Sequence, residues 1–296
     1  MVTFKQLRYA LALQEFRHFK RAAEACSVSQ AALSTSVSEL ENQLGVQIFE
    51  RDRKGILLTA AGEEILEQAR QVDLAIADLE RIALLSKGPL TGDFSLGVIP
   101  TIGPFLLPKI LPKLRAQYPT LRLNLIEQQT HVLIDRVLDG ALDTAIVALP
   151  YPLEGLHSFE FWRENFLVVL NREHPLAKNK SIKSTAIDPA ELLLLEDGHC
   201  LTDHALEICR LRNAIPQNSL SGTSLYTLVQ MVAGKMGITL IPEVANSLIA
   251  NIPEIVSIPL AEDGPHRSFA FIARLNYPGT KNLEELLALS RKILSA

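Results

Sequence analysis

The sequence predicts an all-α winged helix-turn-helix domain, a long linker helix and an α/β domain of two lobes. Three observations indicate this order. Short helical patterns fill residues 1–58, one long apolar heptad pattern follows them, and strand-like runs then alternate with helical stretches. A chain of 296 residues is long enough for two or three domains, and 48% hydrophobic residues are enough for separate cores. We expect domains at 1–58, 59–87 and 88–296.

Apolar residues at helical spacing predict three helices in residues 1–58. They are Phe4, Leu7 and Leu11, then Phe19, Ala22, Ala23 and Cys26 after a break at Arg17 and His18, then Leu33, Val37, Leu40 and Leu44. Ser27 or Ser29 can cap the third helix, and Gly45 can end it. The segment VQIFERDRKGILLT (46–59) then predicts two short strands around a basic turn, which would form the wing.

One long helix is predicted for residues 59–86. Its apolar residues alternate by four and three, as in the seam of a coiled coil: Ile65, Ala69, Val72, Ile76, Leu79 and Ala83. A helix that packs only on its own domain is the alternative. The regular seam favours a partner helix from a second copy of the chain, and therefore a homodimer.

Residues 88–92 (GPLTG) predict a hinge, after which strands and helices alternate. Strand-like runs lie at 94–99, 121–126, 143–149, 166–171, 192–197, 238–242 and 268–274. This order favours parallel sheets covered by helices, in which ligands bind beyond the carboxyl ends of the strands. We expect lobe I at about 92–162 and 265–296, and lobe II at about 163–264.

Composition limits the environment of the chain. No apolar run is long enough to span a bilayer and the N-terminus carries no secretion signal, so we expect a cytoplasmic protein that does not bind membranes. The overall net charge is −4, whereas residues 1–58 hold eight Lys and Arg against six Asp and Glu. That difference is too small to identify a partner on its own.

The third helix presents side chains suited to DNA. Away from its apolar stripe it shows small or hydrogen-bonding residues, and such a helix can enter the major groove and contact base edges. Basic residues on the wing would bind phosphates. We predict a DNA-binding surface of Ser29, Gln30, Ala31, Ser34, Thr35, Arg51, Arg53 and Lys54. An ordinary solvated helix next to a charged turn is the alternative.

The segment EDGHCLTDHALEIC (196–209) is a candidate redox site. Cys200 follows a strand where a helix should begin, and a helix N-terminus, with His199 or His204 if protonated, would stabilise a thiolate. On one continuous helix, Cys200 and Cys209 would lie about 13 Å apart, whereas a disulfide needs roughly 7 Å or less. A bond between them would therefore require local unwinding. Two buried structural thiols are the alternative, and we expect Cys26 to be structural.

These motifs resemble those of a known family. AAEACSVSQAALSTSVSELENQLGVQIFER followed by LLTAAGEEIL resembles the N-terminal domain of LysR-type transcription regulators, and the 196–209 segment resembles the sensing loop of their OxyR branch, the hydrogen peroxide-inducible activators. The resemblance implies two periplasmic-binding-protein-like lobes. It also implies that peroxide oxidises Cys200 to a sulfenic acid, that Cys209 closes a disulfide, and that thioredoxin or glutaredoxin reduces it. By the same resemblance we expect a homotetramer that contacts promoter DNA and RNA polymerase.

The resemblance also implies a peroxide pocket. Its residues would be Thr101, Thr130, His199, Thr223 and Arg267, with Thr223 or Ser224 capping the helix that lines the cleft. For each threonine the alternative is a strand-end or helix-cap hydroxyl, and for Arg267 a surface arginine. This chain departs from the family in the loop, where it carries Thr202 and His204.

Two other functions remain open at this point. The chain could be a LysR-type regulator that responds to a small-molecule inducer and has idle cysteines. It could also be a thiol peroxidase, although the N-terminal domain argues against an enzyme. Neither a metal-ligand cluster nor a cofactor motif is present in the sequence, so we expect no metal and no cofactor.

Overall fold

The computed structural model describes residues 1–52, 55–196, 198–208 and 221–295. The chain divides into two compact units, Met1–Ala83 and Leu84–Ala296, and each is described below by itself. Within the described residues, no helix is long and apolar enough to cross a membrane.

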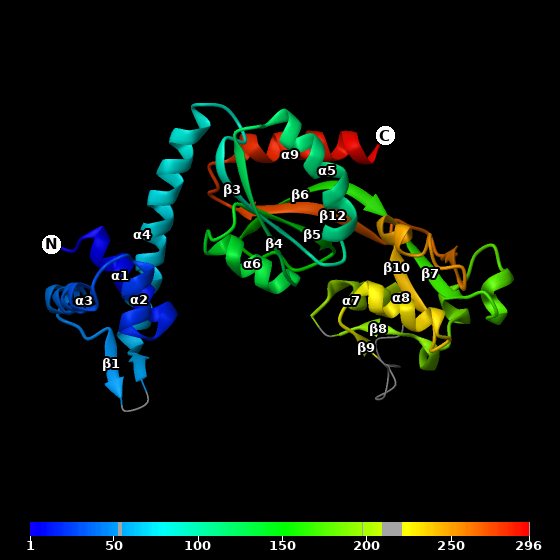
Figure 1. The fold of residues 1–296 in the computed structure, drawn as a ribbon, viewed down its shortest axis with the longest axis horizontal. Coiled ribbons are helices and arrows are strands. Elements are labelled where there is room, and N and C mark those ends of the chain that lie inside the picture. The colour runs from blue at the N-terminus through cyan, green and yellow to red at the C-terminus, as the bar shows by residue number, and fades with distance from the viewer. Residues whose placement is uncertain (53–54, 197, 209–220, 296) are drawn as a thin grey trace. The chain divides into compact units, whose positions relative to one another are not determined.

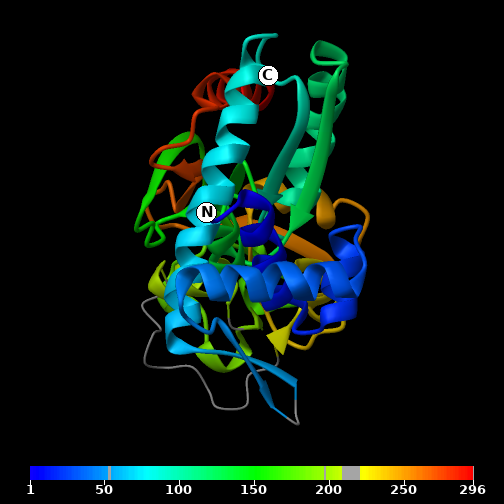
Figure 2. The same ribbon diagram turned by 90° about the vertical axis from the view of Figure 1, so that its left-hand side faces the viewer.

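The first unit contains the predicted winged helix-turn-helix. Its elements are α1 (Phe4–Phe16), α2 (Phe19–Ala25), α3 (Gln30–Leu44), the antiparallel strands β1 (Phe49–Asp52) and β2 (Gly55–Leu58), and the start of α4 (Ala60–Leu85). Arg17 ends α1 in the left-handed region and His18 caps α2, which explains the break in the sequence pattern. Figure 2 shows α3 and the hairpin, with α4 leading away from them.

A small core holds this unit together. Leu33, Val37 and Leu40 of α3 are buried as expected, and Cys26 is half-buried against the same core. Leu44 was expected in this stripe but is 39% exposed. The reason is that Gly45 ends α3 there, with a φ of 70°, so the last turn extends past the core.

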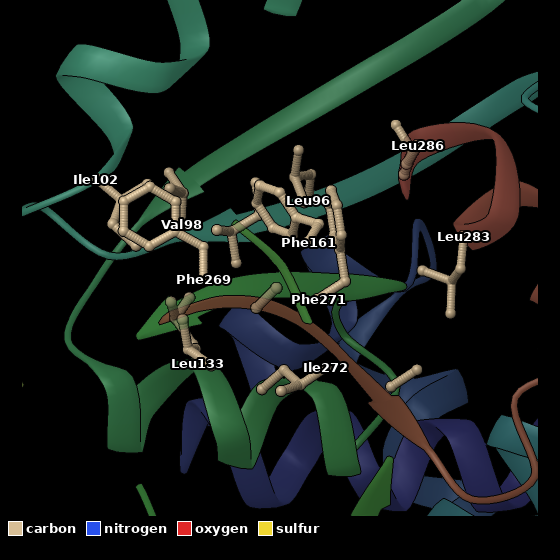
Figure 3. Packing of buried hydrophobic residues seen from close by; sticks show 14 of the residues in the cluster. Leu96, Val98, Ile102, Leu133, Phe161, Phe269, Phe271, Ile272, Leu283 and Leu286 are labelled. Carbon is tan, nitrogen blue, oxygen red and sulfur yellow. The ribbon is translucent and has the colours of Figure 1, made fainter. Parts of the chain in front are cut away.

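Lobe I of the second unit is built on a five-stranded sheet in the order β4-β3-β5-β12-β6. The strands are β3 (Gly92–Val98), β4 (Leu121–Glu127), β5 (Thr144–Leu149), β6 (Leu156–Glu164) and β12 (Arg267–Arg274). Helices α5 (Gly103–Gln117) and α9 (Thr280–Leu294) cover one face, and α6 (Thr130–Leu138) covers the other (Figure 1). Side chains from the sheet and from these helices fill the core of this lobe (Figure 3).

Lobe II contains a three-stranded sheet in the order β10-β7-β11 and a two-stranded sheet, β8-β9. The strands are β7 (Phe166–Asn171), β8 (Leu194–Leu195), β9 (Ser221–Gly222), β10 (Thr239–Pro242) and β11 (Ile255–Pro259). Its two α-helices within the described residues are α7 (Cys200–Ile208) and α8 (Leu225–Ala233), and short 3-10 turns connect other segments. A core of aliphatic side chains lies between these elements.

The expectation of wholly parallel sheets was wrong. In lobe I only β4, β3 and β5 are parallel, because β12 returns from lobe II antiparallel to β5 and β6. In lobe II both neighbours of β7 are antiparallel to it. Strands β6, β9 and β11 were not predicted. Strand β6 has no regular alternation of buried and exposed positions and includes charged residues, and β9 has only two residues.

Candidate functional site

Cys200 lies where the two lobes meet. It is the first residue of α7 and its side chain is 3% exposed. The thiol packs into the core of lobe I, whereas Leu201, Ala205 and Leu206 of the same helix pack into the core of lobe II. A chemical change at Cys200 would therefore act on the contact between the lobes.

The turn before Cys200 is packed closely against lobe I. Gly198 has a φ of +95°, which strongly favours glycine. A Cβ atom at this position would lie 2.6 Å from Oε1 of Gln129, so any larger residue would require the end of the Gln129 side chain to move. Gln129 precedes Thr130 at the start of α6. The glycine therefore allows the segment that carries Cys200 to approach the N-terminus of α6.

Two groups oppose the effect of burial on the thiol. Burial raises the pKa of Cys200 above the usual value for a cysteine, whereas the guanidinium of Arg267 and the hydroxyl of Thr130 lower it, and Asp203 adds a smaller upward effect. The pKa remains raised on balance, so the resting thiol is protonated at neutral pH. Thr130 Oγ1 is buried near the thiol and makes no hydrogen bond of good geometry within the described residues.

Arg267 is held by a buried network. Its Nε donates to Oε1 of Glu164 over 2.6 Å, and both side chains are almost fully buried. Its Nη1 and Nη2 donate to the hydroxyl and the carbonyl oxygen of Thr101, each over 3.2 Å. The second Glu164 oxygen accepts from the backbone N–H of Val244 over 2.8 Å. This network joins Thr101 of lobe I to Val244, next to β10 of lobe II.

The two histidines near the thiol are neutral. Burial lowers the pKa of both His199 and His204, and Arg267 adds to the effect at His204. The sequence suggested that either ring could stabilise a thiolate if protonated, but burial disfavours the charged form. Among the residues that the structure describes, the positive charge near Cys200 comes instead from Arg267.

The structure brings together four of the predicted pocket residues. Thr101, Thr130 and Arg267 join Cys200 through the contacts above, and His199 precedes Cys200 in the chain. Thr223 is exposed, and the cap of α8 is Ser224, whose hydroxyl accepts from the N–H of Thr227. Cys209 lies outside the described residues.

Several parts of this site were not predicted from the sequence. Glu164, Val244 and the carbonyl oxygen of Pro150, which contacts His204 over 2.8 Å, come from three distant segments. The last strand residue Glu164 and the dipeptide Leu149-Pro150 carry no local signal for a thiol site. Only the crossing of the chain between the lobes places them there.

The candidate DNA surface on α3 has mostly exposed side chains. Ser29, Gln30, Ala31 and Thr35 are exposed, and Ser34 is half-buried. Ser29 also caps the helix, because its Oγ accepts from the N–H of Ala32 over 3.2 Å. Of the wing residues, Arg51 belongs to β1, and Arg53 and Lys54 lie outside the described residues.

The seam of α4 divides into two parts. Ala69 is buried in the core of the first unit and Ile65 packs against it. Farther along, Val72 and Leu79 are exposed, and Leu79 reaches 65%. The alternative of a helix that packs on its own domain therefore holds for the first turns only.

Comparison with known families accounts for both units. Residues 4–63 match the family described as bacterial regulatory helix-turn-helix protein, lysR family, and residues 87–294 match the LysR substrate binding domain. The chain belongs to the LysR family of transcription regulators. It has the winged helix-turn-helix and two-lobe α/β architecture of that family, and the family consists of DNA-binding regulators rather than enzymes.

Within the LysR family, the chain is similar to OxyR proteins. It is 36% identical to the DNA-binding transcriptional dual regulator OxyR of Escherichia coli, over 96% of this chain and 93% of that protein. It is also 36% identical to the HTH-type transcriptional regulator EstR of Acinetobacter baylyi, over 98% and 97%.

Solved structures give the same result. A full-length OxyR from Pseudomonas aeruginosa matches with a TM-score of 0.80 and 34% identity, over 98% of this chain and 95% of that chain. A hydrogen peroxide-bound OxyR mutant from Corynebacterium glutamicum matches with a TM-score of 0.68 and 32% identity, over 99% and 92%.

Proposed function

We propose that this LysR-type regulator senses hydrogen peroxide through Cys200 and changes its action on DNA when Cys200 and Cys209 form a disulfide. The observation that supports this most is the surroundings of the thiol. Cys200 is buried at the contact between the lobes, and a guanidinium and a hydroxyl both act to lower its pKa. The similarity to OxyR proteins, several of which are named hydrogen peroxide-inducible activators, supports the identity of the oxidant.

The proposed chemistry has two balanced steps. In the first, the sulfur of Cys200 attacks one peroxide oxygen, an S–O bond forms, the O–O bond breaks, and the departing hydroxide takes up the thiol proton to become water. Sulfur is oxidised by two electrons and peroxide is reduced. In the second, Cys209 attacks that sulfur, an S–S bond forms, and a second water leaves. Hydroxyls of Thr101 and Thr130 would donate to the peroxide oxygens, next to His199.

The second step would disrupt α7. The helix runs from Cys200 to Ile208, the residue before Cys209, and spans about 12 Å along its axis. A disulfide requires Cα atoms within roughly 7 Å. Forming the bond would therefore unwind α7 and pull Leu201, Ala205 and Leu206 from the core of lobe II. Such a change is large enough to alter how the lobes contact each other.

We propose that residues 59–87 pair two chains through the exposed part of the α4 seam and that dimers associate into a tetramer. The surface formed by α3 and the wing would bind promoter DNA. Separately, Thr223 of lobe II would lie near the cleft that holds the peroxide. The rearranged tetramer would change contact with RNA polymerase, and thioredoxin or glutaredoxin would reduce the disulfide.

Mass mapping after peroxide treatment tests the sensor. The reduced full-length protein receives about one equivalent of hydrogen peroxide, and its thiols are then alkylated and mapped. We expect a Cys200–Cys209 disulfide that dithiothreitol reverses, together with a changed DNA footprint. The variant Cys26→Ser serves as the matched control and should form the same bond. Free thiols at both positions under excess peroxide would refute the sensor.

A second candidate function is a LysR-type regulator that binds a small-molecule inducer and uses no thiol chemistry. The similarity to EstR favours it, because that relative is as identical as OxyR and its name carries no reference to peroxide. The variant Cys200→Ser separates the two functions. It would abolish the response to peroxide but would leave a response to an inducer intact.

A further inference from the structure

Helix α7 carries a second reactive side chain on the face that bears Cys200. His204 lies four residues after Cys200, which is about one helical turn, so the two side chains are neighbours along the helix. The imidazole is only 4% exposed. Arg267 and Asp203 affect the pKa of the Cys200 thiol and that of the His204 imidazole, which also indicates that the two side chains have the same charged neighbours.

The hydrogen bonding of His204 determines its tautomer. Nε2 lies 2.8 Å from the carbonyl oxygen of Pro150. A carbonyl oxygen can only accept, so Nε2 must carry the hydrogen. In a neutral ring, Nδ1 then has a free lone pair. Nδ1 is buried and makes no hydrogen bond within the described residues.

We propose that His204 Nδ1 is the base that accepts the proton of the Cys200 thiol when peroxide reacts. This inference rests on the proposed peroxide-sensing function. The proton moves from sulfur to Nδ1 as the S–O bond forms and the O–O bond breaks. The imidazolium then returns the proton to the departing hydroxide, which leaves as water, and His204 is neutral again.

The charges around His204 suit this role. Arg267 of β12 and burial disfavour the imidazolium, whereas Asp203 and Glu207 on α7 favour it. The resting pair is therefore a neutral thiol next to a neutral imidazole, and the carbonyl of Pro150 keeps the basic nitrogen free. Tyr151 also lies near the thiol, since Cys200 contributes to raising the pKa of that phenol. With its raised pKa, Tyr151 remains protonated at neutral pH and does not compete as a base.

The pH dependence of Cys200 oxidation tests the proposal. The full chain carries Cys209→Ser so that the sulfenic acid accumulates, and dimedone traps it after a pulse of hydrogen peroxide. With His204 present, the rate should be nearly constant across neutral pH, because the thiol and imidazole share one proton. In His204→Gln, which keeps a donor for Pro150 but has no basic nitrogen, the rate should rise tenfold per pH unit until the thiol ionises. At pH 7 it should be slower by about 10-fold or more.

The outcomes separate this proposal from the sensor function. His157→Gln, an exposed histidine on β6, is the matched control and should keep the flat profile. Oxidation of Cys200 with the same profile in His204→Gln and the parent overturns the role of His204 and leaves the sensor intact. If Cys200 in the parent does not react at any pH, both proposals fall.

A measurement on the unsubstituted protein guards against misfolding of the variant. Nitrogen-15 NMR of labelled histidine reports which ring nitrogen of His204 is protonated. We expect the Nε2–H tautomer at pH 7 in the reduced protein. Protonation at Nδ1 at that pH would overturn the proposal, because that nitrogen would then have no lone pair to accept the thiol proton.

Discussion

At the scale of single residues, the site depends on one buried ion pair. Arg267 and Glu164 are almost fully removed from water and lie 2.6 Å apart. A buried pair gains little net stability over apolar residues, but loss of one partner leaves an uncompensated charge. The pair therefore fixes the position of a positive charge that lowers the pKa of Cys200.

Arg267→Met should both destabilise the protein and weaken the thiol acid. We expect the free energy of unfolding to fall by about 3–5 kcal/mol, because the Glu164 carboxylate would be buried alone. The double variant with Glu164→Gln should recover part of this loss. Urea unfolding measures the stability, and pH-dependent alkylation should show a higher pKa for Cys200 in both variants.

Arg163→Met is the matched control for that experiment. Arg163 forms an exposed pair with Glu160 over 3.3 Å on the same strand β6. Exposed pairs contribute no more than about 1 kcal/mol. Equal losses for Arg163→Met and Arg267→Met would contradict the importance of the buried pair.

The two buried histidines predict sensitivity to acid. Their pKa values lie below the ordinary value of 6.5 in the folded state. Stability from such groups is present above the unfolded pKa and is lost as pH falls below 6.5 toward the folded pKa, by at most about 1.4 kcal/mol per pH unit for each histidine. His204→Gln should reduce this slope in chemical unfolding curves measured at pH values below 6.5. An unchanged slope would contradict the burial argument.

At the scale of elements, three helices carry separate tasks. Helix α3 presents exposed polar residues, α4 presents an exposed apolar seam, and α7 links the thiol to the lobe II core. Helices α3 and α4 each have a face that the described part of their own unit leaves exposed, and α7 contributes side chains to the cores of both lobes. The predictions for α3 and α4 can therefore be tested by changing single exposed side chains.

Leu79→Glu should weaken the proposed dimer. Leu79 is 65% exposed on α4, so the change costs little in the isolated chain but would bury a charge in a paired seam. Sedimentation velocity should show a shift from dimers or tetramers toward monomers. Glu80→Gln, on the adjacent exposed position, should leave the assembly unchanged. A Leu79→Glu protein that remains fully assembled would contradict pairing through this seam.

Two substitutions should distinguish base contacts from phosphate contacts. Gln30→Ala removes an exposed amide at the start of α3, and we expect a loss of about 1–3 kcal/mol in operator binding with relaxed sequence preference. Arg53→Ala should instead weaken binding to all sequences and lower the salt dependence by about one unit of slope. Fluorescence anisotropy at several salt concentrations measures both. Identical salt slopes for the two variants would contradict the proposed roles.

At the scale of the whole molecule, the second unit has two lobes joined near the thiol site. Glu164 ends β6 of lobe I just before β7 of lobe II begins at Phe166, and Arg267 starts the strand that returns to lobe I. Their ion pair therefore lies at the crossing points of the chain. Cys200, the first residue of α7, packs into the core of lobe I.

Oxidation should loosen α7 while the sheet of lobe I stays intact. We expect faster amide hydrogen exchange over residues 201–208 after peroxide treatment, because a disulfide to Cys209 cannot form across an intact helix. The central strand β5 has mostly buried side chains and pairs with a strand on each side, so it should keep its protection. Cys200→Ser provides the control. Unchanged exchange in α7 despite a mapped disulfide would contradict the unwinding step.

Local patterns alone were sufficient to predict much of the fold. The break at Arg17, the ends of α3 and the start of β7 all follow from side-chain periodicity, caps and glycines near each other in sequence. Cys200 could be identified as the candidate thiol for the same reason, since its neighbours predict a helix start. Local interactions within a few residues determine these features, so they are visible in the sequence.

Only the tertiary structure decided the rest of the site. Whether a strand runs parallel or antiparallel to its neighbours depends on the lobe from which the chain enters the sheet. The antiparallel pairing of β6 and β12 could therefore not be predicted from the residues of these strands. Likewise, Glu164 and Val244 gain their roles by contact across more than 75 positions of sequence. The neutral state of His204 has the same origin, because burial between elements, rather than any neighbour in the chain, disfavours its charge.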